Sequence, residues 1–193
     1  MARMGDDSAR GLATDHAELR ARLERHHREG YAWALSCCGW NTVEAENVLQ
    51  SVYVKILEGS AAYGGRSEFR TWLFAVIRHT AAQERRRNWW LGRKIVNDDA
   101  ALERASIEDD PTDAIYRAEL RAHLQKALAA LPSRQHEVLT LVFHHELTLD
   151  QAAEVMRVSP GSARRHYDRG KRRLRQWIES RKVIDERHSG TRA

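Results

Sequence analysis

Apolar residues recur at intervals of three and four positions along most of this chain, which is the spacing of amphipathic helices. Seven segments carry this pattern: 15–39, 41–57, 67–90, 112–131, 133–143, 148–156 and 160–182. We expect Asn41 and Ser133 to cap the helices that they begin. The spacing places these apolar side chains inside the second and fifth helices: Val48, Leu49, Val52, Ile56, Val138, Leu139, Val142 and Phe143. No stretch of any length alternates apolar and polar residues at the two-residue period of a β-strand. The pattern therefore predicts an all-α protein.

The seven predicted helices fall into two groups, separated by a stretch of weak periodicity. Residues 92–111 contain acidic clusters and end in a proline, so we interpret them as a flexible acidic linker. On either side we expect one small helical domain, the first over 14–91 and the second over 112–182. Residues 1–13 read as a disordered N-terminus, and residues 183–193 as a frayed tail.

The last two predicted helices have the pattern of a helix-turn-helix. Thr148 and Gln151 have the spacing of a capping box at the start of the first helix. Ser159 followed by Pro160 supplies a side-chain cap and a proline at the first position of the second helix. The short turn between them begins with Arg157, where a glycine is usual. Two amphipathic helices joined in this way are typical of DNA-binding proteins.

The second helix of this pair is strongly basic. We expect its interior positions to be Ala163, Tyr167, Leu174 and Ile178. The other faces supply our candidates for DNA binding: Ser162, Arg164, Arg165, His166, Arg169, Lys171, Arg172 and Arg173. The N-terminal members are expected at base edges, and the later run at least partly at phosphates. The alternative is a solvated basic face on an ordinary helical hairpin, which the cap, the proline and the short turn disfavour.

The helix predicted over 67–90 combines aromatic and basic residues. We assign Trp72, Phe74 and Ile77 in its first half to the core. Its second half carries the polar run Arg78, His79, Gln83, Arg85, Arg86 and Arg87. Aromatic rings beside arginines suit stacking on unpaired bases and contact with phosphates. With the glycine-containing loop at 58–66, this helix could form a pocket for one flipped base.

Composition narrows the classes of function. The 193-residue chain has a formal net charge of +5 and a pI of about 9.5, which favours a polyanionic partner. The polar N-terminus lacks the apolar core of a signal peptide, and no apolar run is long enough to span a bilayer. We therefore expect a cytoplasmic protein.

Cysteine and histidine give no sign of a metal site or a catalytic centre. Cys37 and Cys38 are adjacent, which disfavours a bridge between them, and we expect them to fill a helical core. The histidine pairs at 26–27 and 144–145 lack the i, i+4 spacing and the nearby acid of a zinc hydrolase. We place the second pair in a polar turn, and we expect no cofactor, no metal and no enzymatic activity.

With these features the chain resembles the extracytoplasmic-function (ECF) branch of the sigma-70 family of bacterial transcription initiation factors, over about residues 19–178. Residues 45–50 (AENVLQ) are similar to the family's region 2.1–2.2. Residues 69–74 (FRTWLF) and the arginine-rich run after them are similar to region 2.3–2.4. Residues 127–132 (ALAALP) with the helix-turn-helix are similar to region 4.

The resemblance implies partners and a role for each domain. Residues 14–91 would bind core RNA polymerase and would read and melt the promoter −10 element, and residues 112–182 would read the −35 element. The polymerase contact would fall on Glu44, Glu46, Asn47 and Gln50. The −10 contact would fall on Tyr63, Arg66, Ser67, Arg78, His79, Gln83 and Arg86. Trp89 and Trp90 are weaker −10 candidates, because they can instead close the end of the bundle. An anti-sigma factor is an optional further partner.

The chain departs from the family pattern at four of these positions. Asn47 and Ser51 stand where carboxylates are common, which predicts a weaker polymerase contact. His79 and Gln83 stand where asparagine and aspartate are common, which bears on the −10 preference. The alternative function is a stand-alone helix-turn-helix regulator whose N-terminal bundle dimerises or senses a signal. The aromatic and arginine-rich helix argues against it, because a simple repressor needs no melting surface.

Overall fold

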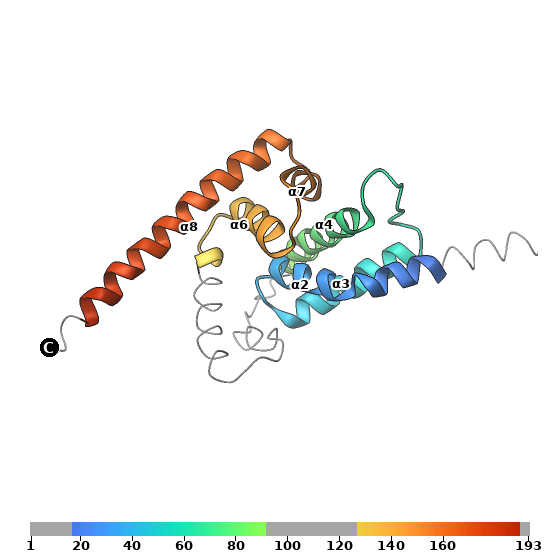
Figure 1. The fold of residues 1–193 in the computed structure, drawn as a ribbon. Helices are drawn as coiled ribbons and strands as arrows, with labels where there is room; N and C mark the ends of the chain where they lie inside the picture. The colour runs from blue at the N-terminus through green and yellow to red at the C-terminus, as the bar shows by residue number, and fades with distance from the viewer. Residues whose placement is uncertain (1–16, 92–126, 190–193) are drawn as a thin grey trace, which may run out of the picture. The chain divides into compact units, whose positions relative to one another are not determined.

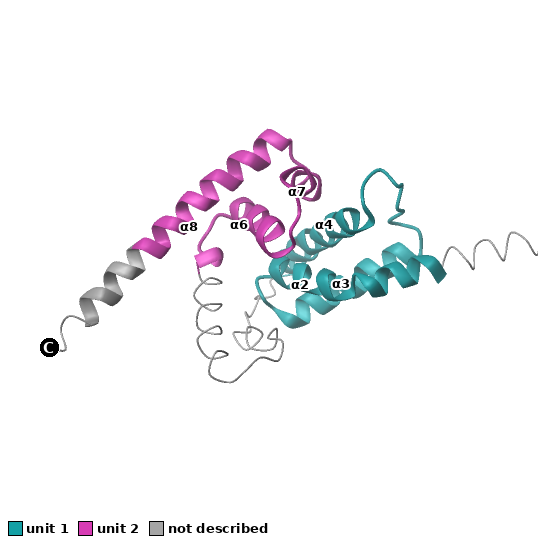
Figure 2. Ribbon diagram, viewed as in Figure 1, with its two compact units in different colours: residues 1–97 teal, residues 98–193 magenta. Residues whose placement is uncertain are grey.

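The computed structural model describes residues 17–91 and 127–189, and within these ranges every regular element is a helix (Figure 1). The chain divides into two compact units, Met1–Asn97 and Asp98–Ala193 (Figure 2). The predicted all-α class is therefore confirmed, and the helix-turn-helix lies in the second unit.

Unit 1 consists of a helical stretch over 17–25, α2 (His27–Cys37), α3 (Thr42–Leu57) and α4 (Phe69–Trp90). Helix α3 begins as the sequence predicts, because the Asn41 side chain accepts a hydrogen bond from the Glu44 N–H at 2.8 Å. A loop over 58–68 joins α3 to α4. Helices α2, α3 and α4 pack against one another in pairs, so the core lies between them (Figure 1).

Aromatic side chains dominate this core. Trp33 and Phe74 are fully buried and stack with their ring centroids 6.0 Å apart. The Trp33 indole N–H donates a hydrogen bond to the Phe74 carbonyl at 3.0 Å, so the buried polar atom is satisfied. Ile77 is also fully buried. The core assignment is thus confirmed for Phe74 and Ile77, whereas Trp72 is only half-buried.

Two helix boundaries in unit 1 differ from the prediction. The first helix is distorted at His26, although the Gly30 N–H still reaches the His26 carbonyl at 2.8 Å and continues the hydrogen-bond ladder. Helix α4 begins at Phe69 with Glu68 at the N-cap position, two residues after the predicted start at residue 67. Ser67 instead offers its carbonyl to the Tyr63 hydroxyl at 2.5 Å, so it belongs to the loop.

Unit 2 contains α6 (Ser133–Leu139), a π-helical segment η2 (Thr140–His144), α7 (Leu149–Met156) and α8 (Pro160–Ser189), preceded by a helical turn over 127–129. The predicted capping box at the start of α7 is present: the Gln151 N–H donates to Thr148 Oγ1 at 3.2 Å, and the Thr148 N–H donates to Gln151 Oε1 at 2.9 Å. Helices α6 and α7 both pack against α8. The buried apolar side chains include Val138, Leu139, Leu141, Val155 and Met156.

Three expectations for unit 2 are wrong, and a fourth is confirmed only in part. Phe143, predicted to lie inside, is 61% exposed, because it belongs to the wide π-helical turn and so departs from the α-helical spacing. Ile178, expected at an interior position of α8, is 40% exposed. Ser133 is the first residue of α6 and not its cap, a position that Pro132 takes. His145 lies in a bend after η2, as predicted, but it is buried and not in a polar environment facing water.

Helix α8 also continues to Ser189, beyond its predicted end at residue 182. No glycine or proline occurs between Gly170 and Gly190. The expected disordered N-terminus (1–13), the acidic linker (92–111) and most of the helix expected over 112–131 lie outside the described residues.

No helix in the described part of the chain is long and apolar enough to cross a membrane. Nor do three potential metal-ligating side chains cluster anywhere within 17–91 or 127–189.

Candidate nucleic-acid interface

The turn between α7 and α8 is held by backbone and side-chain hydrogen bonds. Arg157 adopts the left-handed conformation, with φ 53° and ψ 51°, which costs a non-glycine residue roughly 1–2 kcal/mol. The Val158 N–H bonds the Ala153 carbonyl at 3.0 Å and so satisfies the C-terminal end of α7. On the other side, Ser159 Oγ accepts the Ser162 N–H at 3.2 Å, as its position before Pro160 predicts. The turn is therefore well defined without the usual glycine.

The basic side chains of α8 lie away from its packed face. Ala163 and Gly170 are buried and mark the side of α8 that contacts the unit 2 core. Six of the eight predicted −35 residues are exposed: Arg164, Arg165, Arg169, Lys171, Arg172 and Arg173. The other two, Ser162 and His166, are half-buried. Arg165, Arg169 and Arg172 recur at steps of four and three, so they share one exposed face.

Lys171 differs from the arginines around it because it has partners within α8. Its ammonium lies 4.3 Å from the ring centroid of Tyr167 and 3.9 Å from a carboxylate oxygen of Asp168. The Tyr167 ring in turn stacks on Phe143, with centroids 5.8 Å apart. Lys171 is therefore less available for DNA than its sequence position suggests.

Gly170 sets how closely α8 approaches α6, and the sequence analysis missed it. A Cβ atom at this position would lie 3.0 Å from Leu139 Cδ1 and 3.3 Å from Gln135 Cβ. Only glycine allows this approach without displacing Leu139. The available signal was a glycine in the middle of a helix at an interior step, seven residues after Ala163.

Arg134 was also missed, and it ties α6 to the helix-turn-helix. Its Nη1 donates to the Met156 carbonyl at 3.3 Å and lies 3.3 Å from Glu137 Oε2. The Met156 carbonyl belongs to the last turn of α7, where no intrahelical donor is available. No sequence pattern indicates this contact, because it joins residues 22 positions apart.

The predicted −10 residues of α4 lie largely on its exposed side. His79, Gln83 and Arg86 are exposed and recur at steps of four and three, whereas Arg78 is half-buried. Gln83 also has a structural contact, because Lys55 Nζ donates to its Oε1 at 3.0 Å. On the loop side, Arg66 is exposed, and Tyr63 and Ser67 are half-buried.

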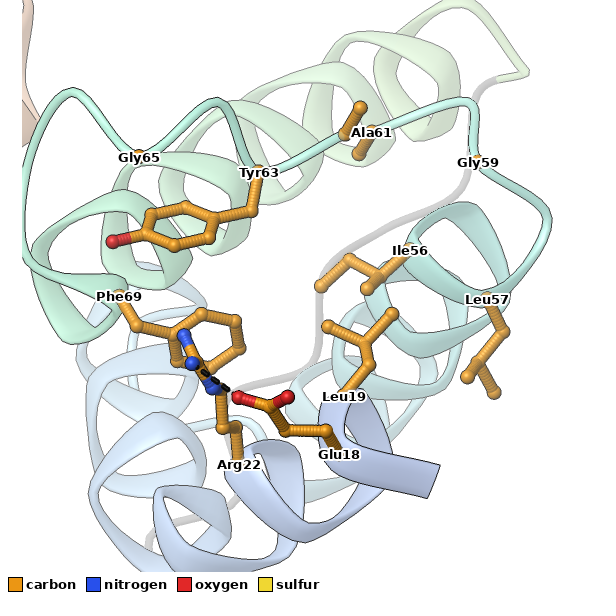
Figure 3. Close-up of a pocket in the computed structure, with 11 residues that line it drawn as sticks. Glu18, Leu19, Arg22, Ile56, Leu57, Gly59, Ala61, Tyr63, Gly65 and Phe69 are labelled. Atoms are coloured by element: carbon orange, nitrogen blue, oxygen red, sulfur yellow. Dashed lines mark hydrogen bonds and ion pairs between the residues drawn. The ribbon is translucent and has the colours of Figure 1, made fainter. Parts of the chain in front are cut away.

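A pocket of about 500 Å³ lies beside the 58–68 loop (Figure 3). Tyr63 and Phe69 line it and meet edge to face, with their ring centroids 5.3 Å apart. Arg22 sits over the Phe69 ring, 5.8 Å from its centroid, and pairs with Glu18 at 2.5 Å. Tyr63 alone of the seven predicted −10 residues lines this pocket, and the 17–25 helix closes it in place of the polar run of α4.

The predicted polymerase-binding residues occupy the outer side of α3, with one exception. Glu46, Asn47 and Gln50 are exposed, whereas Glu44 is half-buried and accepts a hydrogen bond from the Asn88 side chain at 3.2 Å. Val43 and Val54 were missed; they are 65% and 51% exposed and continue the same face. Val43 lies four residues before Asn47, and Val54 lies four residues after Gln50. This helical spacing could have placed both valines on the same face from the sequence alone.

Cys38 lies next to this face, and its thiol is unreactive near neutral pH. Burial and, to a smaller extent, the Glu44 carboxylate raise the pKa of the Cys38 thiol to about 12, and Arg85 opposes them only in part. The thiol therefore stays protonated near neutral pH, which disfavours nucleophilic or redox chemistry at this position. Neither Cys37 nor Cys38 forms a disulfide.

These observations define a class of protein: an all-helical chain of two units, one of which presents a basic helix-turn-helix to DNA. Two family models match the chain, "Sigma-70 region 2" over residues 23–91 and "Sigma-70, region 4" over residues 127–176. Together they span more than half of its length. The chain belongs to the sigma-70 family and is an RNA polymerase sigma factor of the ECF type. Sigma factors are non-enzymatic transcription initiation factors.

Curated relatives and solved structures agree with this family. The chain is 22% identical over 144 residues to the ECF RNA polymerase sigma factor SigW of Bacillus subtilis (strain 168), which covers 72% of this chain and 77% of SigW. The fold is similar to the sigma factor RpoE of Bartonella quintana, solved with the anti-sigma factor NepR, with a TM-score of 0.64, 19% identity, and coverage of 84% and 97%. It is also similar to CnrH, solved with the cytosolic domain of CnrY, with a TM-score of 0.58, 19% identity, and coverage of 89% and 97%.

Proposed function

We propose that this sigma factor recognises a two-part promoter, with α8 on the −35 element and unit 1 on the −10 element. The observation that supports this most directly is the exposed face of α8. Arg165, Arg169 and Arg172 follow a capped turn, and none of them pairs with a carboxylate within the described residues. Arginines without carboxylate partners on one helical face are available for bases and phosphates.

Within α8 we assign bases to the N-terminal arginines and phosphates to the later ones. Loss of an arginine that binds guanine through two hydrogen bonds should cost about 1–3 kcal/mol and relax the preference at one base pair. Arg172→Ala should instead weaken all sequences alike and lower the salt slope by about one. Binding of Arg165→Ala and Arg172→Ala to a set of −35 variants tests this division, and identical sequence profiles would contradict it.

We propose that α3 binds the large subunit of core polymerase through Glu46, Asn47 and Gln50, with Glu44 at the border. Exposed Val43 and Val54 support a protein partner, because apolar side chains beside uncharged polar ones are typical of interface cores. A carboxylate at position 47 is common in the family, so Asn47→Asp should strengthen binding to the core enzyme. Competition against a second sigma factor measures it, with Glu24→Gln on the exposed 17–25 helix as a control. Unchanged or poorer competition by Asn47→Asp would contradict the assignment.

For melting we propose that Tyr63, Arg66 and Ser67 act with Arg78, His79, Gln83 and Arg86 to hold unpaired bases. The pocket beside Tyr63 offers apolar and aromatic walls for one flipped base, and stacking on an aromatic ring stabilises a base by about 1–3 kcal/mol. Permanganate footprinting should show reactive thymines with the wild type. Arg78→Ala or His79→Ala should lose them while polymerase binding persists. Normal opening by both variants would place the melting surface elsewhere.

Three further parts of the proposal concern context. We place the protein in the cytoplasm, because bacterial core polymerase is there, and we assign it no catalytic activity of its own. We include an anti-sigma factor among its partners, since the similar sigma factor RpoE of Bartonella quintana was solved with one. We also keep 14–91 and 112–182 as the two functional domains, with 92–111 as the linker.

Run-off transcription with purified bacterial core polymerase over a library of genomic fragments tests the function as a whole. Specific transcripts that appear only when this protein is added are the expected result. A stand-alone helix-turn-helix regulator would instead bind DNA without polymerase and would add no new start sites. Such a result would overturn the proposal.

A further inference from the structure

Trp89 and Trp90 form an exposed aromatic pair at the C-terminal end of α4. They are 74% and 79% exposed, and their rings meet edge to face with centroids 5.2 Å apart. This exposure disfavours the alternative in which they close the end of the bundle. Removing an indole ring from water is favourable, so a pair of rings this exposed marks a surface that contacts another molecule.

Trp90 continues the polar face of α4. His79, Gln83, Arg86 and Trp90 are all exposed and follow one another at steps of four, three and four, which places them along one side of the helix. Eleven residues of helix rise about 16 Å. This distance corresponds to about five base-pair steps of about 3.4 Å, so the face is long enough to follow several nucleotides.

The positive charge at the C-terminal end of α4 favours the binding of a polyanion. Arg85 and Arg87 are engaged in the fold, since Arg85 donates to the Cys37 carbonyl at 2.8 Å and Arg87 pairs with Glu84 at 2.6 Å. Arg86 is exposed and has no side-chain partner among residues 17–91 and 127–189. It lies three and four residues before Trp89 and Trp90, hence beside them on the helix surface. An available guanidinium next to two exposed rings is the combination that binds single-stranded nucleic acid.

We propose that Trp89 and Trp90 form a stacking site for one unpaired promoter base, at the end of the DNA strand that follows α4. This inference rests on the proposed −10 function and adds a contact to it. A paired base has both faces covered by its neighbours, whereas an unpaired base offers a free face to an indole ring. Arg86 would hold the adjacent phosphate. Stacking carries little sequence preference, so the pair would stabilise the open promoter without selecting its sequence.

Fluorescence of 2-aminopurine in the full holoenzyme tests this site, because stacking on a ring quenches the probe. The probe is placed at one position at a time, through and on both sides of the −10 element of a promoter that the wild type opens. We expect one position at which the wild type quenches and Trp90→Ala does not. Trp90→Ala should also shorten the lifetime of the open complex about tenfold, and Trp89→Ala should shorten it less.

Three control variants separate stacking from a protein contact. Trp90→Phe keeps an aromatic face and should keep both the quenching and the lifetime. Trp90→Leu keeps an apolar side chain without a π face and should behave like Trp90→Ala. Leu91→Ala removes the neighbouring apolar side chain, which is 59% exposed, and should change neither readout.

The possible results distinguish failure of the proposed stacking site from failure of the proposed −10 function on which it rests. A lifetime that Trp90→Leu preserves and Leu91→Ala shortens would identify an apolar contact with a protein and overturn the inference. Unchanged quenching in Trp89→Ala and Trp90→Ala would overturn it as well, with promoter opening intact. If the wild type opens no promoter with any core polymerase, the proposed function fails and the inference fails with it.

Discussion

Helices α4 and α8 both carry runs of arginine, yet the structure uses these runs differently. In α4, Arg85 and Arg87 make short contacts with Cys37 and Glu84. In α8, Arg169 and Arg172 are exposed and have no partner in the described part of the chain. Arg85 reaches a backbone carbonyl of α2, against which α4 packs, and Arg87 pairs with a carboxylate of its own helix. Arg169 and Arg172, by contrast, lie away from the packed face of α8 that Ala163 and Gly170 mark. Arginine content alone therefore does not locate a DNA-binding face.

The two cores differ as well. Unit 1 is organised around Trp33 and Phe74, whereas unit 2 is built from aliphatic side chains and the close approach at Gly170. The stability of a core with large rings depends on a few residues. The stability of a core of smaller side chains depends on how closely its helices approach one another. Variants in each should therefore fail in different ways.

The largest effect is expected from Trp33→Ala. It removes a fully buried indole and its hydrogen bond to the Phe74 carbonyl, which should cost about 3–5 kcal/mol. Hydrogen exchange resolved by segment should show lost protection in α2, α3 and α4, with α6 to α8 unaffected. Trp33→Phe keeps a stacking ring and should cost less. Equal loss of protection in α8 would contradict the division into two units.

Gly170→Ala should be the next largest and should act on unit 2. The new methyl would meet Leu139 at 3.0 Å, and overpacking of this kind costs about 1–3 kcal/mol. Gly161→Ala is the matched control, because no atom lies within 4 Å of its Cβ position and alanine is the better helix former. Urea unfolding measures both variants. Equal stabilities would show that α8 can move away from α6 without cost.

Arg85→Ala and Arg172→Ala should separate structural from DNA-binding arginines. The first loses a hydrogen bond to the Cys37 carbonyl, worth about 0.5–1.5 kcal/mol, and should leave the salt dependence of promoter binding nearly unchanged. The second should leave stability unchanged and lower the salt slope by about one. Denaturation and a salt titration of binding are both needed. Reversed results would mean that exposure in the free protein does not mark the contact surface.

The smallest effect concerns His136 in α6. Burial lowers its pKa below the usual 6.5, and Glu137 only partly opposes this. A group whose folded pKa is depressed supplies stability above its unfolded pKa and loses it as the pH falls through the folded value. Unit 2 should therefore lose stability below about pH 6.5, and His136→Gln should reduce that slope. Urea unfolding at several pH values measures it, and an unchanged slope in His136→Gln would assign the effect to another group.

The sequence predicts helix starts and buried positions correctly where residues close together in the chain determine the structure. The caps at Asn41, Thr148 and Ser159 are such cases, because each involves residues three positions apart. The buried positions of α3 followed from its period. The error at Phe143 arose where a π turn overrides that period. The −10 and polymerase candidates occupy exposed or half-buried positions of unit 1, and their roles stay predictions.

The sequence by itself determined the helical class, the helix-turn-helix and the sigma-70 family, because capping, periodicity and motif order are local properties of the chain. Only the tertiary structure decided which side chains are available. In the fold, Arg85 contacts the Cys37 carbonyl and Lys171 contacts the Tyr167 ring. His145 is buried, and Trp89 and Trp90 are exposed. Each of these outcomes depends on where a helix meets its neighbours, and residues far apart in sequence set that geometry.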